Sequence, residues 1–154
     1  MRAIVGVLVA LSVTVVCQAQ EWSRFRGVQG QGLGKADLPT VFGDQHIQWR
    51  SAIDGTGHSS PVLWGDRLFL TRVSDVKGKR EIVCYDADTG KQAWSYTCDF
   101  KSHKQHRLNS FASSTPAADE LGVYVTWTSG DKLVAIALDH QGELLWQREL
   151  GDYY

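Results

Sequence analysis

The sequence is poor in cysteine, proline and methionine, with 3, 3 and 1 of these residues among 154. Only Cys84 and Cys98 lie beyond the apolar N-terminus, which excludes a dense disulfide framework. The chain has no adjacent Cys-Cys pair and no C-x-x-C-H haem motif. If a turn at residues 86–91 joins antiparallel strands, Cys84 faces Ala93 and lies ~17 Å from Cys98. A disulfide needs Cα atoms within ~7 Å, so two free thiols are expected.

Long runs of one charge sign are also absent. The 16 Lys and Arg are interspersed with 17 Asp and Glu along the chain. A nucleic-acid-binding protein would show a basic patch or stripe, so no nucleic-acid partner is expected. Beyond the N-terminus, no apolar run approaches the ~20 residues that a membrane-spanning helix needs. No transmembrane segment is therefore predicted in the chain that remains after signal cleavage.

The N-terminus has the pattern of a secretory signal peptide. Arg2 precedes the uncharged stretch Ala3–Val16, and small residues follow up to Ala19. We predict a signal peptide at residues 1–19 and a periplasmic or secreted product. A lipid-modified Cys17 is the alternative, disfavoured because Val16 is bulky. Cleavage removes Arg2 alone among charged residues and leaves 15 Lys and Arg against 17 Asp and Glu, a net charge of −2.

Short β-branched and aromatic runs, separated by turn residues, indicate an all-β fold. A sustained 3.6-residue apolar period is missing after the signal peptide. The predicted strands are 47–50, 62–64, 68–71, 81–85, 93–96, 117–118, 123–127, 133–138 and 144–148. Four glycines at positions 27–34 predict a surface loop anchored by Trp22 and Phe25. This loop lacks the Gly-Lys-Ser/Thr ending of a phosphate-binding P-loop.

One strand–turn–strand unit occurs twice, as CYDADTGKQAW (Cys84–Trp94) and ALDHQGELLW (Ala137–Trp146). Each copy has a small residue, an Asp two positions later, a turn with Gly, and a Trp four residues after the Gly. Corresponding positions are separated by 52 to 55 residues. Four antiparallel strands in a period near ~50 residues are typical of a β-propeller blade. Asp and Gly in such turns bind backbone groups and supply a positive φ.

These observations predict a partial β-propeller of about two four-stranded antiparallel blades plus an N-terminal strand. We divide the chain into a signal peptide (1–19), a Gly-rich segment with a lone strand (20–56), and two incomplete-propeller blades within 57–154, at about 57–100 and 110–150. Propellers close with ~4–8 blades, so the chain is interpreted as an N-terminal fragment of a longer propeller. Trp49 would then close the last blade. The open strand edges predict aggregation or non-cooperative melting of the isolated chain.

The repeat resembles the A-x-D-x-x-T-G-x-x-x-W unit of the pyrroloquinoline-quinone-like (PQQ-like) β-propellers. The matching residues, interpreted as structural, are Cys84, Asp86, Thr89, Gly90 and Trp94 in the first copy and Ala137, Asp139, Gly142 and Trp146 in the second. The opening WSRFRGVQGQGLG is similar to the start of exported bacterial members. A WD-type propeller is excluded because no Trp in the chain is followed by Asp.

The resemblance implies one of two functions. Quinoprotein dehydrogenases of this family hold PQQ and calcium and oxidise alcohols or sugars, and they usually carry a Cys-Cys pair. Other members bind no cofactor and act as interaction scaffolds, like the periplasmic lipoprotein that assists outer-membrane β-barrel assembly. We favour an exported non-enzymatic scaffold that binds a protein or cell-envelope component and needs no cofactor. The alternative is the N-terminal part of a PQQ- and calcium-dependent dehydrogenase. Carbohydrate binding through exposed Trp and Tyr is a third hypothesis.

Three groups of residues have the types used in catalytic or metal sites. His103 and His106 have a spacing compatible with zinc, but a third ligand is missing nearby and a solvated basic loop is favoured. His58 precedes two serines, although adjacent residues rarely face each other as a nucleophile and its base do. The acids Asp86, Asp88 and Asp139 could bind calcium, but their place in the repeat favours a role in the turns. We therefore assign no catalytic or metal-binding residue.

Overall fold

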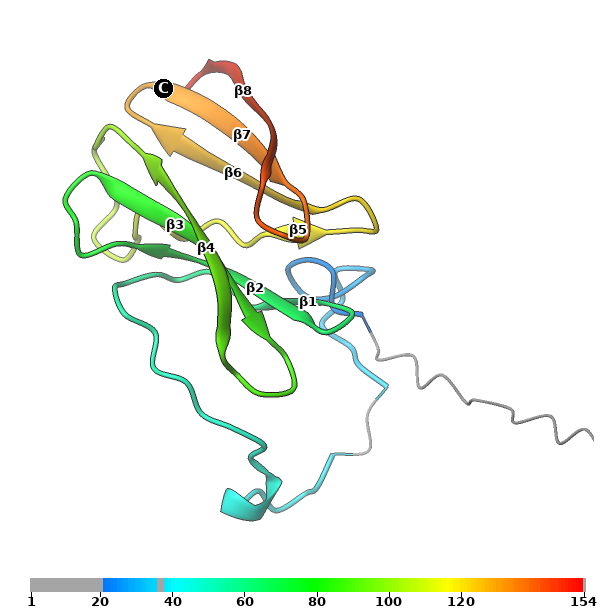
Figure 1. Ribbon diagram of the computed structural model, residues 1–154. Coiled ribbons are helices and arrows are strands. Elements are labelled where there is room, and N and C mark those ends of the chain that lie inside the picture. Colours follow the sequence, from blue (N-terminus) through cyan, green and yellow to red (C-terminus); the bar gives the residue numbers. More distant parts are fainter. Residues whose placement is uncertain (1–20, 36–37, 154) are drawn as a thin grey trace, which may run out of the picture.

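The computed structural model describes residues 21–35 and 38–153, which form two four-stranded antiparallel sheets. Blade 1 has the order β1-β2-β3-β4 and blade 2 the order β5-β6-β7-β8 (Figure 1). The strands are β1 (Val62–Trp64), β2 (Arg67–Val73), β3 (Lys79–Asp86), β4 (Gln92–Asp99), β5 (Ala117–Ala118), β6 (Val123–Ser129), β7 (Lys132–Leu138) and β8 (Leu144–Asp152). The only helix among the described residues is the short 3-10 turn η1 (Asp44–His46). This all-β architecture confirms the predicted pair of propeller-type blades.

Each of the eight observed strands contains a predicted one, and the structure mainly lengthens them. The predicted strand at residues 47–50 does not form. Ile47 has an extended backbone, with φ −97° and ψ 113°, but this segment has no neighbouring strand with which to form a ladder. Residues 47–50 therefore cross blade 1 as a segment that pairs with no strand. The predicted signal peptide and Cys17 lie outside the described residues.

The β3–β4 and β7–β8 hairpins share a β-bulge at the same position of the repeat. Cys84 pairs with Trp94 and Ala137 pairs with Trp146, after which the register shifts by one residue. In blade 1 this register shift leaves Ala93 of β4 without a partner in β3. The expectation that Cys84 faces Ala93 is therefore wrong by one residue, because a bulge adds a residue to one strand only. Cys98 pairs with Arg80, and both cysteines are free thiols, as predicted.

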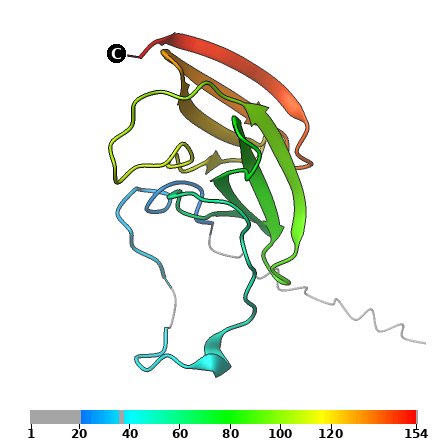
Figure 2. The same cartoon turned by 90° about the vertical axis from the view of Figure 1, so that its left-hand side faces the viewer.

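The main core lies between the two sheets, which face each other (Figure 2). Alternate residues of β3, including Ile82 and Cys84, point toward blade 2 and are fully buried. They pack with Phe69 of β2 and with Ile136 and Leu138 of β7. The intervening β3 residues form a second cluster on the far face of blade 1. Both faces of the central strands are thus apolar, as expected for a sheet covered on two sides.

The glycine-rich N-terminal loop closes the inner edges of both blades. Trp22 exchanges two backbone hydrogen bonds of 3.0 Å with Leu63 of β1. The next residue, Ser23, accepts a 2.8 Å bond from the Ala118 backbone of β5. The Trp22 ring also covers Gly27, where φ is +78° and a Cβ would approach the ring to 3.1 Å. Residues 24–31 form turns and bends and residues 32–34 have no regular structure, which agrees with the predicted loop. Phe25, predicted to anchor it, is instead 58 % exposed. In the described part of the chain, no helix is long and apolar enough to cross a bilayer.

Candidate functional site

The first repeat turn, Asp86–Lys91, is organised by the Asp86 carboxylate. Its Oδ1 accepts hydrogen bonds from the Thr89 hydroxyl at 2.7 Å and from the Thr89 backbone at 2.8 Å. The Gly90 backbone donates to the Asp86 carbonyl at 2.9 Å with φ +68°, a conformation that favours glycine. The bond from the Thr89 hydroxyl, followed by that from its backbone, lowers the pKa of Asp86. The Asp86 carboxylate therefore stabilises the turn.

The second repeat turn is one residue shorter and is built in the same way. Asp139 Oδ1 accepts bonds from the backbone of Gln141 at 2.9 Å and of Glu143 at 2.8 Å. The Gly142 backbone donates to the Asp139 carbonyl at 3.1 Å, with φ +88°. These backbone donors replace the threonine that this copy lacks. Both predicted Asp–Gly pairs thus have the geometry of turn formers.

A tryptophan of the preceding segment lies on each of these turns. The Trp94 indole donates a 3.0 Å bond to the His140 carbonyl, and a Cβ at Gly142 would lie 2.7 Å from its ring. The Trp49 indole donates a 2.8 Å bond to the Ala87 carbonyl, and a Cβ at Gly90 would overlap its ring. In both cases the acceptor is the residue directly after the turn aspartate. The chain thus makes the same tryptophan–turn contact twice.

The third tryptophan of the series, Trp146, has no such turn to lie on. Trp146 is 39 % exposed, and its ring centroid lies 6.3 Å from that of Tyr124. Among the described residues, the Trp146 indole takes part in no hydrogen bond. The small residues opposite the repeat tryptophans, Cys84 and Ala137, are fully buried. Burial raises the pKa of the Cys84 thiol to about 12, so it is not a reactive group.

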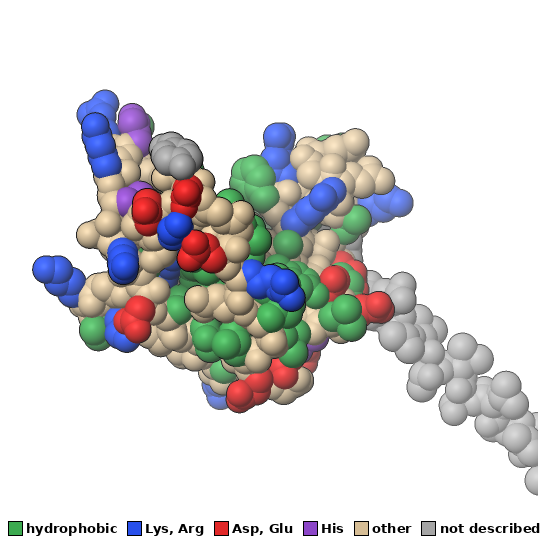
Figure 3. All heavy atoms as spheres, turned by 90° about the horizontal axis from the view of Figure 1, so that it is seen from above, with side chains coloured by type: hydrophobic (Ala, Val, Ile, Leu, Met, Phe, Trp, Pro, Cys, Tyr) green, Lys and Arg blue, Asp and Glu red, His purple; other side chains and the backbone are tan. Residues whose placement is uncertain are grey.

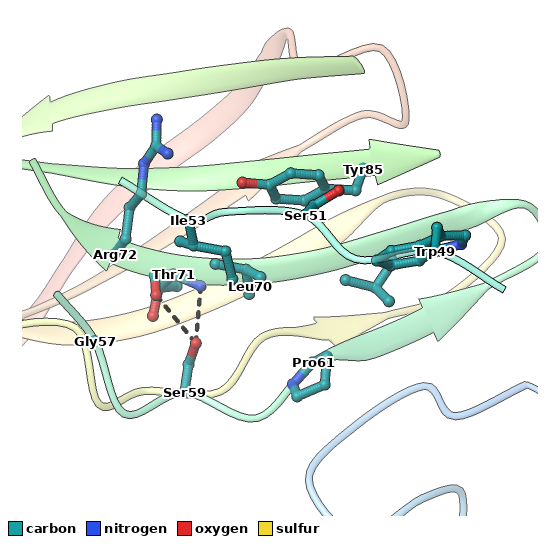
Figure 4. A pocket seen from close by; sticks show the side chains of 11 residues that line it. Trp49, Ser51, Ile53, Gly57, Ser59, Pro61, Leu70, Thr71, Arg72 and Tyr85 are labelled. Carbon is teal, nitrogen blue, oxygen red and sulfur yellow. Dashed lines mark hydrogen bonds between the residues drawn. The ribbon is translucent and has the colours of Figure 1, made fainter. Parts of the chain in front are cut away.

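An apolar cavity of about 280 Å³ lies between blade 1 and the segment that crosses it (Figure 4). Leu70 and Tyr85 line it from the sheet, and Trp49 and Ile53 line it from the crossing segment. Ser59 lies at the margin of the cavity, and its hydroxyl is already hydrogen-bonded to the Thr71 backbone. The hydroxyl accepts from the Thr71 N–H at 2.9 Å and donates to the Thr71 carbonyl at 3.1 Å. The cavity offers apolar surface with few free polar groups.

The histidines singled out in the sequence do not converge. His103 packs edge-on against Phe111 at 5.1 Å, whereas the His106 ring accepts a 3.3 Å bond from the Leu108 backbone. His58 lines a shallow depression with Ser113 and Ser114, separate from the hollow that His103 lines. Across residues 21–35 and 38–153, no three His, Cys, Asp or Glu side chains are grouped to hold a metal ion. Zinc and calcium sites thus gain no support from the geometry.

Sequence reasoning missed Arg80, a buried cation at the junction of the blades. Arg80 is 1 % exposed, and its guanidinium lies 3.8 Å from the Trp127 ring centroid and 4.9 Å from that of Phe100. Its Nη1 donates to the carbonyls of Thr128 at 2.9 Å and Phe111 at 3.3 Å. Desolvation lowers the pKa of Arg80 to about 10, which still leaves it charged at neutral pH. The alternation Arg80–Ile82–Cys84 was the available signal, since it places Arg80 on the inner face.

The repeated turn-and-tryptophan geometry agrees with a comparison against known families. The family model described as outer membrane protein assembly factor BamB, a PQQ-like repeat family, matches residues 40–152. The chain belongs to this family. A search of curated proteins found no match. The family match covers both blades and the segment that carries Trp49, so all three repeat tryptophans lie within it.

Proposed function

We propose that this protein is an exported, non-enzymatic scaffold whose blades hold a binding surface for another protein or a cell-envelope component. The name of the matching family, an outer membrane assembly factor, supports a role in binding other proteins. The repeat aspartates also support a non-enzymatic role, because the carboxylates of Asp86 and Asp139 accept hydrogen bonds within their own turns. The proposal requires no PQQ or calcium.

The observation that carries this proposal is an apolar arm at residues 38–46. Leu38, Val41 and Phe42 are 73 %, 79 % and 66 % exposed, although all three are large and apolar. Figures 1 and 2 show this part of the chain standing away from both sheets. Exposed apolar side chains grouped in this way typically mark a site of protein interaction. The arm is therefore our candidate contact surface for the partner.

Site-specific photo-cross-linking of the full chain in its native cells tests the proposal. A photoreactive residue at Phe42 is expected to give a discrete adduct with one envelope protein. The same group at Val76, which is 61 % exposed in the β2–β3 hairpin, is the matched control and should give none. Equal labelling from both positions would contradict a specific contact at the arm.

An enzymatic assay addresses the dehydrogenase hypothesis directly. The full chain, supplied with PQQ and Ca²⁺, is tested for oxidation of alcohols and sugars with a dye acceptor. The scaffold hypothesis predicts no turnover above that of the cofactors alone. Activity that depends on both additions would overturn it in favour of a quinoprotein.

A further inference from the structure

One small hollow at the junction of the blades gathers most of the unpaired buried polar atoms. Among the described residues, four buried side-chain nitrogens have no hydrogen-bond partner: Nε and Nη2 of Arg80, Nδ1 of His103 and Nδ1 of His140. Arg80 and His103, which carry three of the four, line the same hollow of about 80 Å³, called here the Arg80 hollow. Such unpaired groups are few in native proteins, and a bound ion or water is a common reason for them.

The wall of the Arg80 hollow offers hydrogen-bond donors and no acid. Gln105 and Asn109 contribute amides and Ser114 a hydroxyl, and no Asp or Glu is among the described residues that line the hollow. The loop between β4 and β5, residues 100–116, contains two Lys, one Arg and two His but no acidic residue. Figure 3 shows Lys, Arg and His side chains together at the upper left of the molecule, the side on which this loop lies in Figure 1. The surroundings therefore favour an anion.

The positive charge of Arg80 has a free edge. Its Nη1 donates to the carbonyls of Thr128 and Phe111, which leaves Nε and Nη2. These two nitrogens form one edge of the guanidinium, and that edge matches the two oxygens of a carboxylate. Desolvation lowers the pKa of Arg80, and the Cys98 thiol is the neighbour that raises it. Burial raises the pKa of this thiol to about 11, so it is neutral at pH 7 and does not balance the charge.

We propose that the Arg80 hollow binds a carboxylate group, which pairs with the Nε and Nη2 edge of Arg80 and accepts hydrogen bonds from the wall of the hollow. A carboxylate carries one negative charge, which balances the one buried cation. At roughly 30 Å³ per water molecule, the hollow has the volume of two or three waters, enough for a carboxylate group. Cofactor pockets measure ~300–1,000 Å³, so the hollow is too small for PQQ.

Entry of the carboxylate requires side chains to move. Nε and Nη2 of Arg80 and Nδ1 of His103 are closed to solvent as the side chains stand. His103 and Gln105 are half-buried residues of the loop, so they are the groups that we expect to turn aside. A free small acid and an acidic side chain of another protein share the carboxylate chemistry, and the experiments below distinguish these two sources.

Sodium acetate is the first probe, compared with sodium chloride at equal ionic strength. Acetate should raise the thermal unfolding midpoint of the full chain and shift the NMR signal of the Arg80 Nε–H, with half-saturation on the order of 1 mM. Chloride should do neither. Arg80→Met, which keeps most of the packing, should weaken the acetate effect by at least about 10-fold. Lys104→Gln, at an exposed residue of the loop outside the hollow, is the control and should keep the effect.

Gln105→Glu tests the site without changing Arg80. This variant places a carboxylate in the wall of the hollow, so it should raise the unfolding midpoint at neutral pH and remove the response to acetate. Ser102→Glu adds the same charge at an exposed residue of the same loop and should do neither. Equal effects of the two variants would show that general charge, rather than the hollow, is responsible, and would contradict the proposal.

Two end-blocked tripeptides, Gly-Glu-Gly and Gly-Gln-Gly, identify the source of the carboxylate. Competition with acetate by the Glu peptide alone indicates an acidic side chain of a partner, whereas acetate binding without competition indicates a small free acid. Equal responses to acetate and chloride, or an acetate response that Arg80→Met leaves intact, would overturn the proposal. Figures 1 and 2 show the loop and the apolar arm on different parts of the molecule, so these results do not bear on the arm.

Discussion

The guanidinium of Arg80 lies over the ring of Trp127, 3.8 Å from its centroid, and joins blade 1 to blade 2. None of the ion pairs in the described part of the chain involves Arg80. Its Nε and Nη2 atoms are buried without a hydrogen-bond partner. The charge is therefore held by two aromatic rings and two carbonyls rather than by a carboxylate. Such contacts in a desolvated site stabilise a cation by ~2 kcal/mol or more.

Replacing Arg80 by alanine is expected to destabilise the fold by about 3 kcal/mol. The change removes the aromatic stacking and the bonds to Thr128 and Phe111, and it leaves a cavity. Arg80→Met should cost only about 1 kcal/mol, because it keeps the packing and removes the unpaired donors. The midpoint of urea unfolding, followed by tryptophan fluorescence, measures both. Equal losses in the two variants would contradict the assignment of most of the loss to side-chain packing, because only Met keeps that packing.

Gly142→Ala should lower the free energy of unfolding by about 3 kcal/mol. The new Cβ would lie 2.7 Å from the Trp94 ring, at a residue whose φ of +88° is unfavourable for alanine. Gly65→Ala is the matched control, with φ +56° and no heavy atom within 4 Å of its Cβ. Only the backbone strain of about 1 kcal/mol applies there. Thermal unfolding of the two variants separates overlap with the ring from strain.

Trp94→Phe removes the indole N–H while keeping most of the aromatic surface. We expect a loss of about 1 kcal/mol, the net contribution of one hydrogen bond to the His140 carbonyl. Trp146→Phe should leave the stability of the isolated chain unchanged, because Trp146 is 39 % exposed and makes no such bond. Denaturant midpoints of both variants provide the comparison. A similar loss at both positions would show that the two tryptophans are equivalent, contrary to the geometry.

The Asp86 carboxylate predicts a pH effect with a defined sign. Its pKa is lowered in the folded state, mainly by the Thr89 hydroxyl, so folding is favoured when the group is ionised. This contribution is present above the ordinary aspartate pKa of about 3.9 and is lost as pH falls through the lower folded value. Asp86→Asn should flatten the dependence of the unfolding midpoint on pH below about pH 4. Parallel profiles for wild type and variant would contradict the assignment.

Neither thiol should react readily in the native protein. Burial raises the pKa of Cys84 to about 12 and that of Cys98 to about 11. At pH 8 the thiolate fraction of Cys84 is then on the order of one in ten thousand. Labelling with a chromogenic disulfide reagent should be slow in buffer and complete for Cys84 and Cys98 in denaturant. Rapid labelling of the folded protein would show that the blades open locally.

Much of the blade architecture could be predicted because its signals are local. Runs such as Val123–Trp127 between turn residues mark strands, and the Asp–Gly–Trp spacing marks the β3–β4 and β7–β8 hairpins. Residues 47–50 have the same strand pattern, but a strand needs a neighbour, and the described chain supplies none beside them. The bulge at Ala93 was also hidden, since pairing register depends on the partner strand. Arg80 looked like a surface charge until the second blade buried it.

The turn-length difference between the two repeats has a consequence for protein engineering. Asp86 and Gly90 are four positions apart, whereas Asp139 and Gly142 are three apart, yet each glycine precedes its tryptophan by four residues. The hairpin loop absorbs the extra residue, and the bulge resets the strand at Trp94 and Trp146 alike. The hairpins therefore behave as interchangeable cassettes. Grafting the shorter loop into blade 1 should therefore preserve the register of β3 and β4, although it alters the turn that Gln48, Trp49 and Ser51 contact. Designed arrays of such blades can then vary loop length without changing the strands.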